Sequence, residues 1–133
     1  MRVAAVDLGK VRVGLAVTDE LGLMAHPRPA LDGRNRRALL ARLVELVHDE
    51  QVELFVVGLP LDPSGRDGPA AREARAFAAQ VEQATSVPVE LWDERFTTVE
   101  AQRRLRDAGR NARSSRQRID SAAACVLLQA WLD

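Results

Sequence analysis

The sequence lacks several features that would place it in a common class of protein. Its single cysteine, Cys125, can form neither an internal disulfide nor a cysteine-based zinc site. No apolar run approaches the roughly 20 residues that a transmembrane helix needs. The first apolar run is broken by Asp7, too early for a signal peptide. We therefore expect a cytoplasmic protein with no membrane partner.

The sequence also lacks net charge, because 19 lysines and arginines balance 19 aspartates and glutamates. Taken alone, this balance argues against a surface coated with positive charge for nucleic acid. It conceals an asymmetry along the chain, however. Residues 1–102 carry 12 basic and 16 acidic side chains, whereas residues 103–118 carry seven arginines and one acid, Asp107. One short segment is therefore strongly basic within an otherwise acidic chain.

The chain contains enough hydrophobic residues to form one core. It has 133 residues, of which 47% are hydrophobic, and this length leaves no room for a second domain of ordinary size. A chain of this size buries roughly two-thirds of its surface on folding. The sequence thus predicts a single globular domain over residues 1–133.

The first part of the chain is typical of a meander of strands. An apolar run over residues 3–6 ends at Asp7, and residues 13–17 alternate apolar and small or polar side chains, so the two segments predict a hairpin. Residues 23–26 are a possible third strand, which Pro27 and Pro29 would confine to an edge of the sheet.

The rest of the chain alternates helices and strands. We expect helices over 34–49, 69–84, 97–109 and from Ile119 onward, strands over 54–58 and 87–92, an exposed loop over 59–68 and a mobile basic loop over 110–116. A meander followed by strand–helix alternation predicts an α/β fold. In that fold a mixed sheet has antiparallel first strands and helices on both faces.

Acidic side chains stand where such a sheet usually binds ligands. Asp7 ends the first strand, Asp93 and Glu94 end the last strand, and Asp120 lies early in the last helix. Sites in these folds form at the carboxyl ends of strands, and carboxylates are the ligands that Mg²⁺ prefers. From position alone, ordinary roles remain open: a turn at Asp7, a cap or turn at Asp93, and a favourable helix dipole at Asp120.

Four motifs together resemble the YqgF (RuvX) family. The motifs span residues 7–19, 57–61, 93–98 and 119–124, and the resemblance runs from residue 3 to about residue 132. It implies an RNase H-like fold and an acidic triad at Asp7, Glu94 and Asp120, with the adjacent Asp93 as a reserve metal ligand. Phe96 departs from the family pattern, in which leucine is commoner.

The resemblance also implies a function. We expect a hydrolase, a metal-dependent nuclease that cleaves phosphodiester bonds with two Mg²⁺ or Mn²⁺ ions. Processing of the 5′ end of pre-16S rRNA in ribosome biogenesis is the first hypothesis, and Holliday junction resolution in DNA recombination is the second. A non-catalytic RNA-binding module is a third possibility. The start of the chain also resembles actin-like ATPases, which need two related domains. The chain is expected to be a monomer or a homodimer.

Basic residues near the acidic positions are candidates for contact with nucleic acid. Arginine forks match phosphate oxygens, and each neutralised phosphate releases counterions. The alternatives are ordinary solvated charges and, for the residue after the acidic pair, an ion pair with a carboxylate. The loop over 59–68 leaves a strand at its carboxyl end and could also contact the substrate. The candidates for nucleic-acid binding are Lys10, Arg12, Arg95, Arg110, Arg113 and Arg116.

Overall fold

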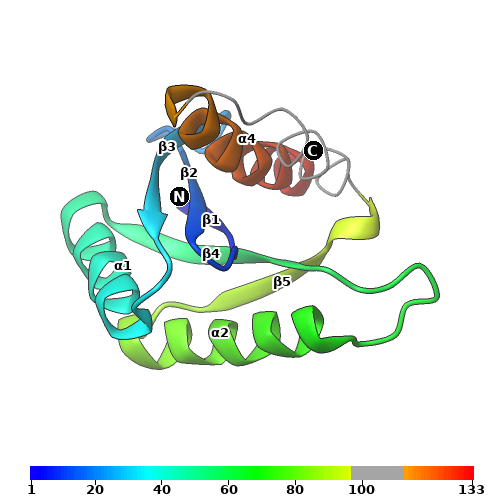
Figure 1. The fold of residues 1–133 in the computed structure, drawn as a ribbon. Coiled ribbons are helices and arrows are strands. Elements are labelled where there is room, and N and C mark those ends of the chain that lie inside the picture. Colours follow the sequence, from blue (N-terminus) through cyan, green and yellow to red (C-terminus); the bar gives the residue numbers. More distant parts are fainter. Residues whose placement is uncertain (97–112) are drawn as a thin grey trace.

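The computed structural model describes the backbone of residues 1–96 and 113–133 and the side chains of residues 1–95 and 121–133. Five strands form one sheet in the order β3-β2-β1-β4-β5. Figure 1 shows this sheet between helices on its two sides. The strands are β1 (Arg2–Asp7), β2 (Arg12–Thr18), β3 (Ala25–Asp32), β4 (Val52–Leu59) and β5 (Val89–Asp93).

The directions of the strands bring four strand ends to one end of the sheet. β1 pairs antiparallel with β2, and β2 with β3, whereas β1–β4 and β4–β5 are parallel pairs. The strands β1, β3, β4 and β5 therefore all finish at the same place. We call this place the carboxyl end of the sheet. The predicted hairpin and mixed sheet are confirmed.

In the described part of the chain, three α-helices cover the two faces of this sheet. α1 (Arg36–Glu50) and α2 (Pro69–Thr85) lie on one face, and α4 (Arg113–Leu132) lies on the other, as Figure 1 shows. Residues near the start of α1 and α2 favour these two helices. The Asn35 side chain caps α1 by accepting a hydrogen bond from the Ala38 amide at 3.1 Å, and Pro69 occupies the first turn of α2. A 3₁₀ turn, η1 (Glu94–Phe96), directly follows β5.

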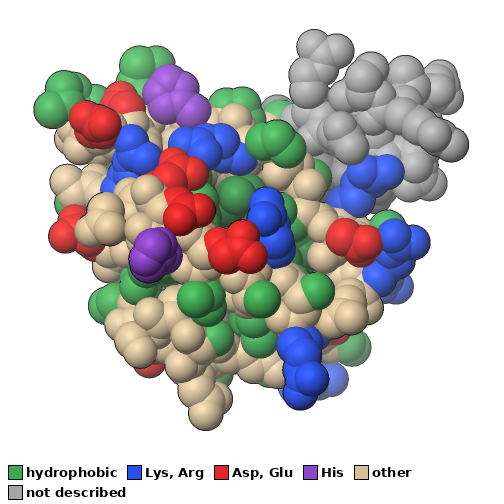
Figure 2. Space-filling model, turned by 90° about the vertical axis from the view of Figure 1, so that its left-hand side faces the viewer, with side chains coloured by type: hydrophobic (Ala, Val, Ile, Leu, Met, Phe, Trp, Pro, Cys, Tyr) green, Lys and Arg blue, Asp and Glu red, His purple; other side chains and the backbone are tan. Residues whose placement is uncertain are grey.

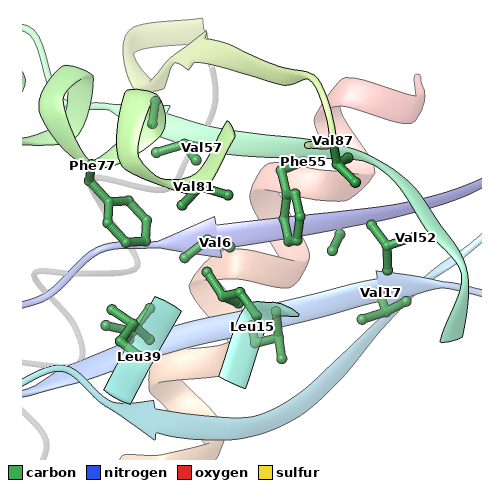
Figure 3. Packing of buried hydrophobic residues seen from close by; sticks show 14 residues of the cluster. Val6, Leu15, Val17, Leu39, Val52, Phe55, Val57, Phe77, Val81 and Val87 are labelled. Atoms are coloured by element: carbon green, nitrogen blue, oxygen red, sulfur yellow. The ribbon is translucent and has the colours of Figure 1, made fainter. Parts of the chain in front are cut away.

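Alternating side chains divide the core into two layers. Ala4 and Val6 of β1 pack with α1 and α2 in the layer drawn in Figure 3, which also holds Phe55 and Phe77. Val3 and Ala5 of β1 instead pack with α4 in the second layer. Because side chains alternate along a strand, the last residue of β1 faces the α4 side.

Some predicted boundaries were wrong. β3 continues through both of its prolines, which an edge strand tolerates because its outer side needs no ladder hydrogen bonds. α4 begins at Arg113, so the basic loop predicted over 110–116 gives way to helix in its second half. The helix predicted over 97–109 lies outside the described residues. No described helix is long and apolar enough to span a membrane.

Candidate active site

Asp7 is a buried carboxylate at the carboxyl end of the sheet. It is the last residue of β1, pairs with Gly14 of β2 and is 2% exposed. The alternation described above directs its side chain to the α4 face. Burial of a carboxylate costs free energy unless other groups or a cation compensate the charge. An ordinary exposed turn, the alternative that the sequence left open, does not describe this residue.

Glu94 is a second buried carboxylate on the same side of the sheet. It opens η1, is 2% exposed and folds back over Gly58 of β4. A Cβ atom at Gly58 would overlap the Glu94 Oε1 and lie 3.2 Å from its Cδ. The absence of a side chain at Gly58 therefore makes the space that the carboxylate occupies.

The register of β1 and β4 brings these two carboxylates together. Val6 pairs with Val57, so one further step along both strands sets Asp7 beside Gly58. Neighbouring strands lie about 4.8 Å apart, and the Glu94 carboxylate rests directly on Gly58. Asp7 and Glu94, which are 87 positions apart in the sequence, thus lie near each other in the buried region at the carboxyl end of the sheet.

Asp93, adjacent in sequence, has a different environment. Arg95 donates from Nε and Nη2 to its carboxylate at 3.0 and 2.7 Å, and the Arg95 amide adds a bond of 2.9 Å. These hydrogen bonds hold the pKa of the Asp93 carboxyl below its usual range, with the side-chain bond the main cause. Asp93 is thus engaged by a cation of its own chain, whereas Glu94 lies over Gly58.

The third predicted carboxylate, Asp120, belongs to α4. Hydrogen bonds from the described side chains of α4 hold this helix against the sheet. Ser121 donates from Oγ to the Arg28 carbonyl of β3, and Trp131 donates from Nε1 to Glu90 of β5 at 3.0 Å. α4 packs on the same face as Asp7. Asp120 is in this helix, one residue before Ser121, but its side chain lies outside the described residues.

The donor set fits a hard divalent cation. Mg²⁺ is commonly held by one or two carboxylates together with water and phosphate oxygens, and Asp7 and Glu94 supply two buried carboxylates in one place. Within the described side chains no group of three possible metal ligands occurs. A third ligand from the chain would have to come from elsewhere, and the helix carrying Asp120 covers this face.

The predicted basic residues are distributed unevenly around the site. Lys10 is exposed in the turn after β1, and Arg12 begins β2. Arg95 pairs with Asp93, the alternative that the sequence left open. Arg113 and Arg116 belong to α4, with side chains outside the described residues, and Arg110 lies outside them altogether.

Two residues with a part in this arrangement were missed by sequence reasoning. Gly58, which lies within the motif over residues 57–61, makes room for Glu94. Gly65, in the connection from β4 to α2, has a φ of +87°, and a Cβ there would lie 3.0 Å from Arg95 Nη1. Glycine in a buried strand is a recognisable sign of close approach, so the signal at Gly58 was available.

Comparisons with known proteins show the family to which the chain is similar. The model of the RuvX family, described as Holliday junction resolvase, matches residues 1–133. Two curated relatives, from Anaeromyxobacter sp. (strain Fw109-5) and Anaeromyxobacter dehalogenans (strain 2CP-1 / ATCC BAA-258), are each named "Putative pre-16S rRNA nuclease". They are 47% and 48% identical over 133 residues, which is 100% of this chain and 97% of each relative.

A solved structure supports the fold. The structure described as T. thermophilus RuvC in complex with Holliday junction substrate matches with a TM-score of 0.62 and 19% identity. The match covers 98% of this chain and 93% of that one. The predicted RNase H-like α/β fold is therefore confirmed, with helices on both faces of the sheet.

Proposed function

The chain belongs to the RuvX family of Holliday junction resolvases, and from that membership we propose that it is a divalent-metal-dependent nuclease acting on a ribosomal RNA precursor. The observation that carries the proposal is the pair of buried carboxylates, Asp7 and Glu94, beside Gly58. Buried carboxylates that converge beneath a covering helix are suited to holding cations. Hydrolysis of phosphodiester bonds is the activity that such a site supports.

In this proposal the chain supplies a rigid set of oxygen ligands. Asp7 is fixed by strand pairing on β1, and Glu94 is fixed by η1 against the backbone of β4. Asp120 would complete the set from α4, while Asp93 would remain with Arg95 as a reserve ligand. Two Mg²⁺ or Mn²⁺ ions bound there would activate a water and stabilise the leaving oxygen of the phosphodiester.

The proposed substrate is pre-16S rRNA, because curated relatives of nearly the same length are named as nucleases of that RNA. The family resemblance implies its 5′ end as the place of cleavage. The protein would then work in the cytoplasm. The family description favours a second candidate, a four-way DNA junction. Resolution of a junction requires two active sites, so that candidate needs a homodimer, whereas a monomer would suffice for RNA.

Asp7→Asn tests the metal site. Replacing the Asp7 carboxylate by an amide should lower cleavage by more than about 100-fold in Mg²⁺ or Mn²⁺. Mutation of residues that only hydrogen-bond to a metal ligand already costs about 10- to 100-fold in metal affinity or activity. The measurement compares cleavage of precursor rRNA, single-stranded RNA and junction DNA, with each metal and with chelator. Full activity of Asp7→Asn on any of these substrates would refute the site.

Asp49→Asn is the matched control for this experiment. It makes the same chemical change at an exposed position near the end of α1, where the side chain is 72% exposed. It should therefore cleave like the unmodified protein. Preferential cleavage of junction DNA would favour the second candidate. RNA binding that is indifferent to metal, with no cleavage of any substrate, would instead indicate a non-catalytic binding module.

A further inference from the structure

The connection between β4 and α2 is an ordered loop and projects past the ends of β4 and β5 (Figure 1). One carboxylate organises it. Asp62 Oδ1 accepts hydrogen bonds from the Ser64 amide at 2.9 Å, the Ser64 hydroxyl at 2.6 Å and the Arg66 amide at 3.0 Å. The Gly65 amide closes the turn by donating to the Asp62 carbonyl at 2.9 Å. We call residues 62–66 the Asp62 loop.

The Asp62 loop rests against the residue that follows Glu94. Gly65 has a positive φ and lies close to the Arg95 side chain. A Cβ atom added to Gly65 would be 3.0 Å from Arg95 Nη1. Arg95 in turn is held by the Asp93 carboxylate at 2.7 Å. Arg95 therefore lies between the Asp93 carboxylate and the loop, and the loop is close to the turn that carries Glu94. In this arrangement Arg95 supports the loop, and its charge is already matched by a partner.

Arg66 differs from most of the arginines whose side chains the structure describes, because it has no such partner. Among the lysine and arginine side chains that the structure describes, three make neither an ion pair nor a hydrogen bond: Lys10, Arg37 and Arg66. They follow the ends of β1, β3 and β4, so all three stand at the carboxyl end of the sheet. Cations without a carboxylate partner can neutralise phosphate without first breaking an ion pair.

The opposite end of the sheet shows the contrast. There Glu50 accepts hydrogen bonds from Arg28 at 2.6 and 2.7 Å and from Arg2 at 2.9 Å, so both guanidinium groups are matched. Figure 2 views the amino ends of β4 and β5, where acidic and basic side chains are intermixed over the surface. The described cations without a partner thus stand at the same end of the sheet as Asp7 and Glu94.

We infer that the Asp62 loop is a preorganised phosphate-binding element, in which Arg66 binds a backbone phosphate of the nucleic acid strand that enters the site. The inference rests on the proposed nuclease function and adds a residue and a direction of approach to it. The hydrogen bonds of Asp62 set the loop before the substrate arrives, so little ordering is left to be done on binding. Arg95 is a positioning residue for this loop.

Arg66→Ala tests the contact by binding alone. Fluorescence anisotropy of a labelled single-stranded RNA, titrated in chelator over a series of salt concentrations, measures affinity without cleavage. The variant should bind about 5- to 10-fold more weakly and lower the slope of log affinity against log salt by about 0.7, the value for one phosphate. Arg42→Ala is the control, because Arg42 is exposed on α1 and paired with Glu45 at 3.0 Å.

Asp62→Ala separates preorganisation from simple charge. Removing a negative charge should strengthen RNA binding if only net charge matters. Loss of the three hydrogen bonds to its carboxylate should weaken binding if the loop must be preset. Tighter binding by Asp62→Ala, or an unchanged affinity and slope in Arg66→Ala, would overturn the inference. Thermal unfolding checks that each variant is folded.

The outcomes also distinguish this inference from the proposed function. Cleavage by the unmodified protein combined with unaltered binding by Arg66→Ala would overturn the role of the loop alone. Weakened binding by Arg66→Ala combined with no cleavage of any substrate would overturn the nuclease proposal alone. A four-way DNA junction, used as a second labelled probe, shows whether the phosphate contact serves RNA or DNA.

Discussion

At the scale of single residues, the absence of a side chain at Gly58 determines where the Glu94 carboxylate can lie. It is an interior residue of β4, and the Glu94 carboxylate occupies the volume where a Cβ would stand. The atoms that a new methyl group would meet belong to the flexible end of Glu94. An added methyl group can therefore be accommodated by moving the carboxylate, with β4 left in place.

Gly58→Ala should separate activity from stability. The displaced carboxylate would lower cleavage by about 100-fold, since a shift of about 1 Å in a catalytic group has that effect. The free energy of unfolding should fall by at most about 2 kcal/mol. Cleavage rates and urea denaturation measure the two effects. Gly68→Ala is the control, because nothing lies within 4 Å of a Cβ at that position. Unaltered cleavage by Gly58→Ala would show that the position of Glu94 is unimportant.

At the scale of elements, η1 is the short turn on which the position of Glu94 depends. Its geometry is held by the Asp93–Arg95 pair, which closes over the first residues of the turn. α4 is held at separate points along its length, including Ser121 to β3 and Trp131 to Glu90 of β5. The buried pair of carboxylates thus depends on a turn and a strand end, and the covering helix is fixed independently of both.

The Asp93–Arg95 pair should make part of the stability pH-dependent. The pKa of Asp93 is lowered in the folded protein because Arg95 donates to its carboxylate. Its stabilisation is therefore fully present above the unfolded value of about 3.9 and is lost as the pH falls through the lower folded value. Asp93→Asn should cost about 1 kcal/mol or less at pH 7, and the cost should shrink below about pH 4. A cost that is the same at pH 7 and pH 3 in urea denaturation would contradict this account.

At the scale of the whole molecule, a formal charge of zero hides an uneven distribution of unpaired cations. The described cations without partners stand at the carboxyl end of the sheet, and Glu50 neutralises two arginines at the other end. The seven arginines of residues 103–118 lead directly to Asp120 in the sequence. A molecule with a formal charge of zero can therefore still present a positive surface to a phosphate backbone.

Replacing Arg110, Arg113 and Arg116 together with alanine should weaken binding without unfolding the domain. If each arginine neutralises one phosphate of a single strand, the salt slope should fall by about 2. Anisotropy titrations at several salt concentrations measure the slope, and circular dichroism with thermal melting monitors the fold. An unchanged slope would remove these three residues from the binding surface.

Much of the fold could be predicted from local patterns. Alternation over residues 13–17 and the apolar run over 54–58 correspond to β2 and β4, and Pro69 begins α2 as predicted. The boundaries of two elements were predicted less accurately. β3 runs through Pro27 and Pro29 because its outer side is an edge, and α4 begins at Arg113 although residues 110–116 have no apolar side chain except Ala112.

The sequence by itself determined which chemical groups are available and at which strand ends they stand, because hydrophobic periodicity fixes the elements and Asp7 and Glu94 follow two of them. Tertiary structure decided what each group faces. Adjacent residues 93 and 94 look interchangeable in a sequence, yet one is bound by Arg95 and the other lies over Gly58. That difference arises from the register of β1, β4 and β5, which no local pattern encodes. Net charge was likewise a property of composition, whereas the gathering of unpaired described cations at one end of the sheet came only from folding.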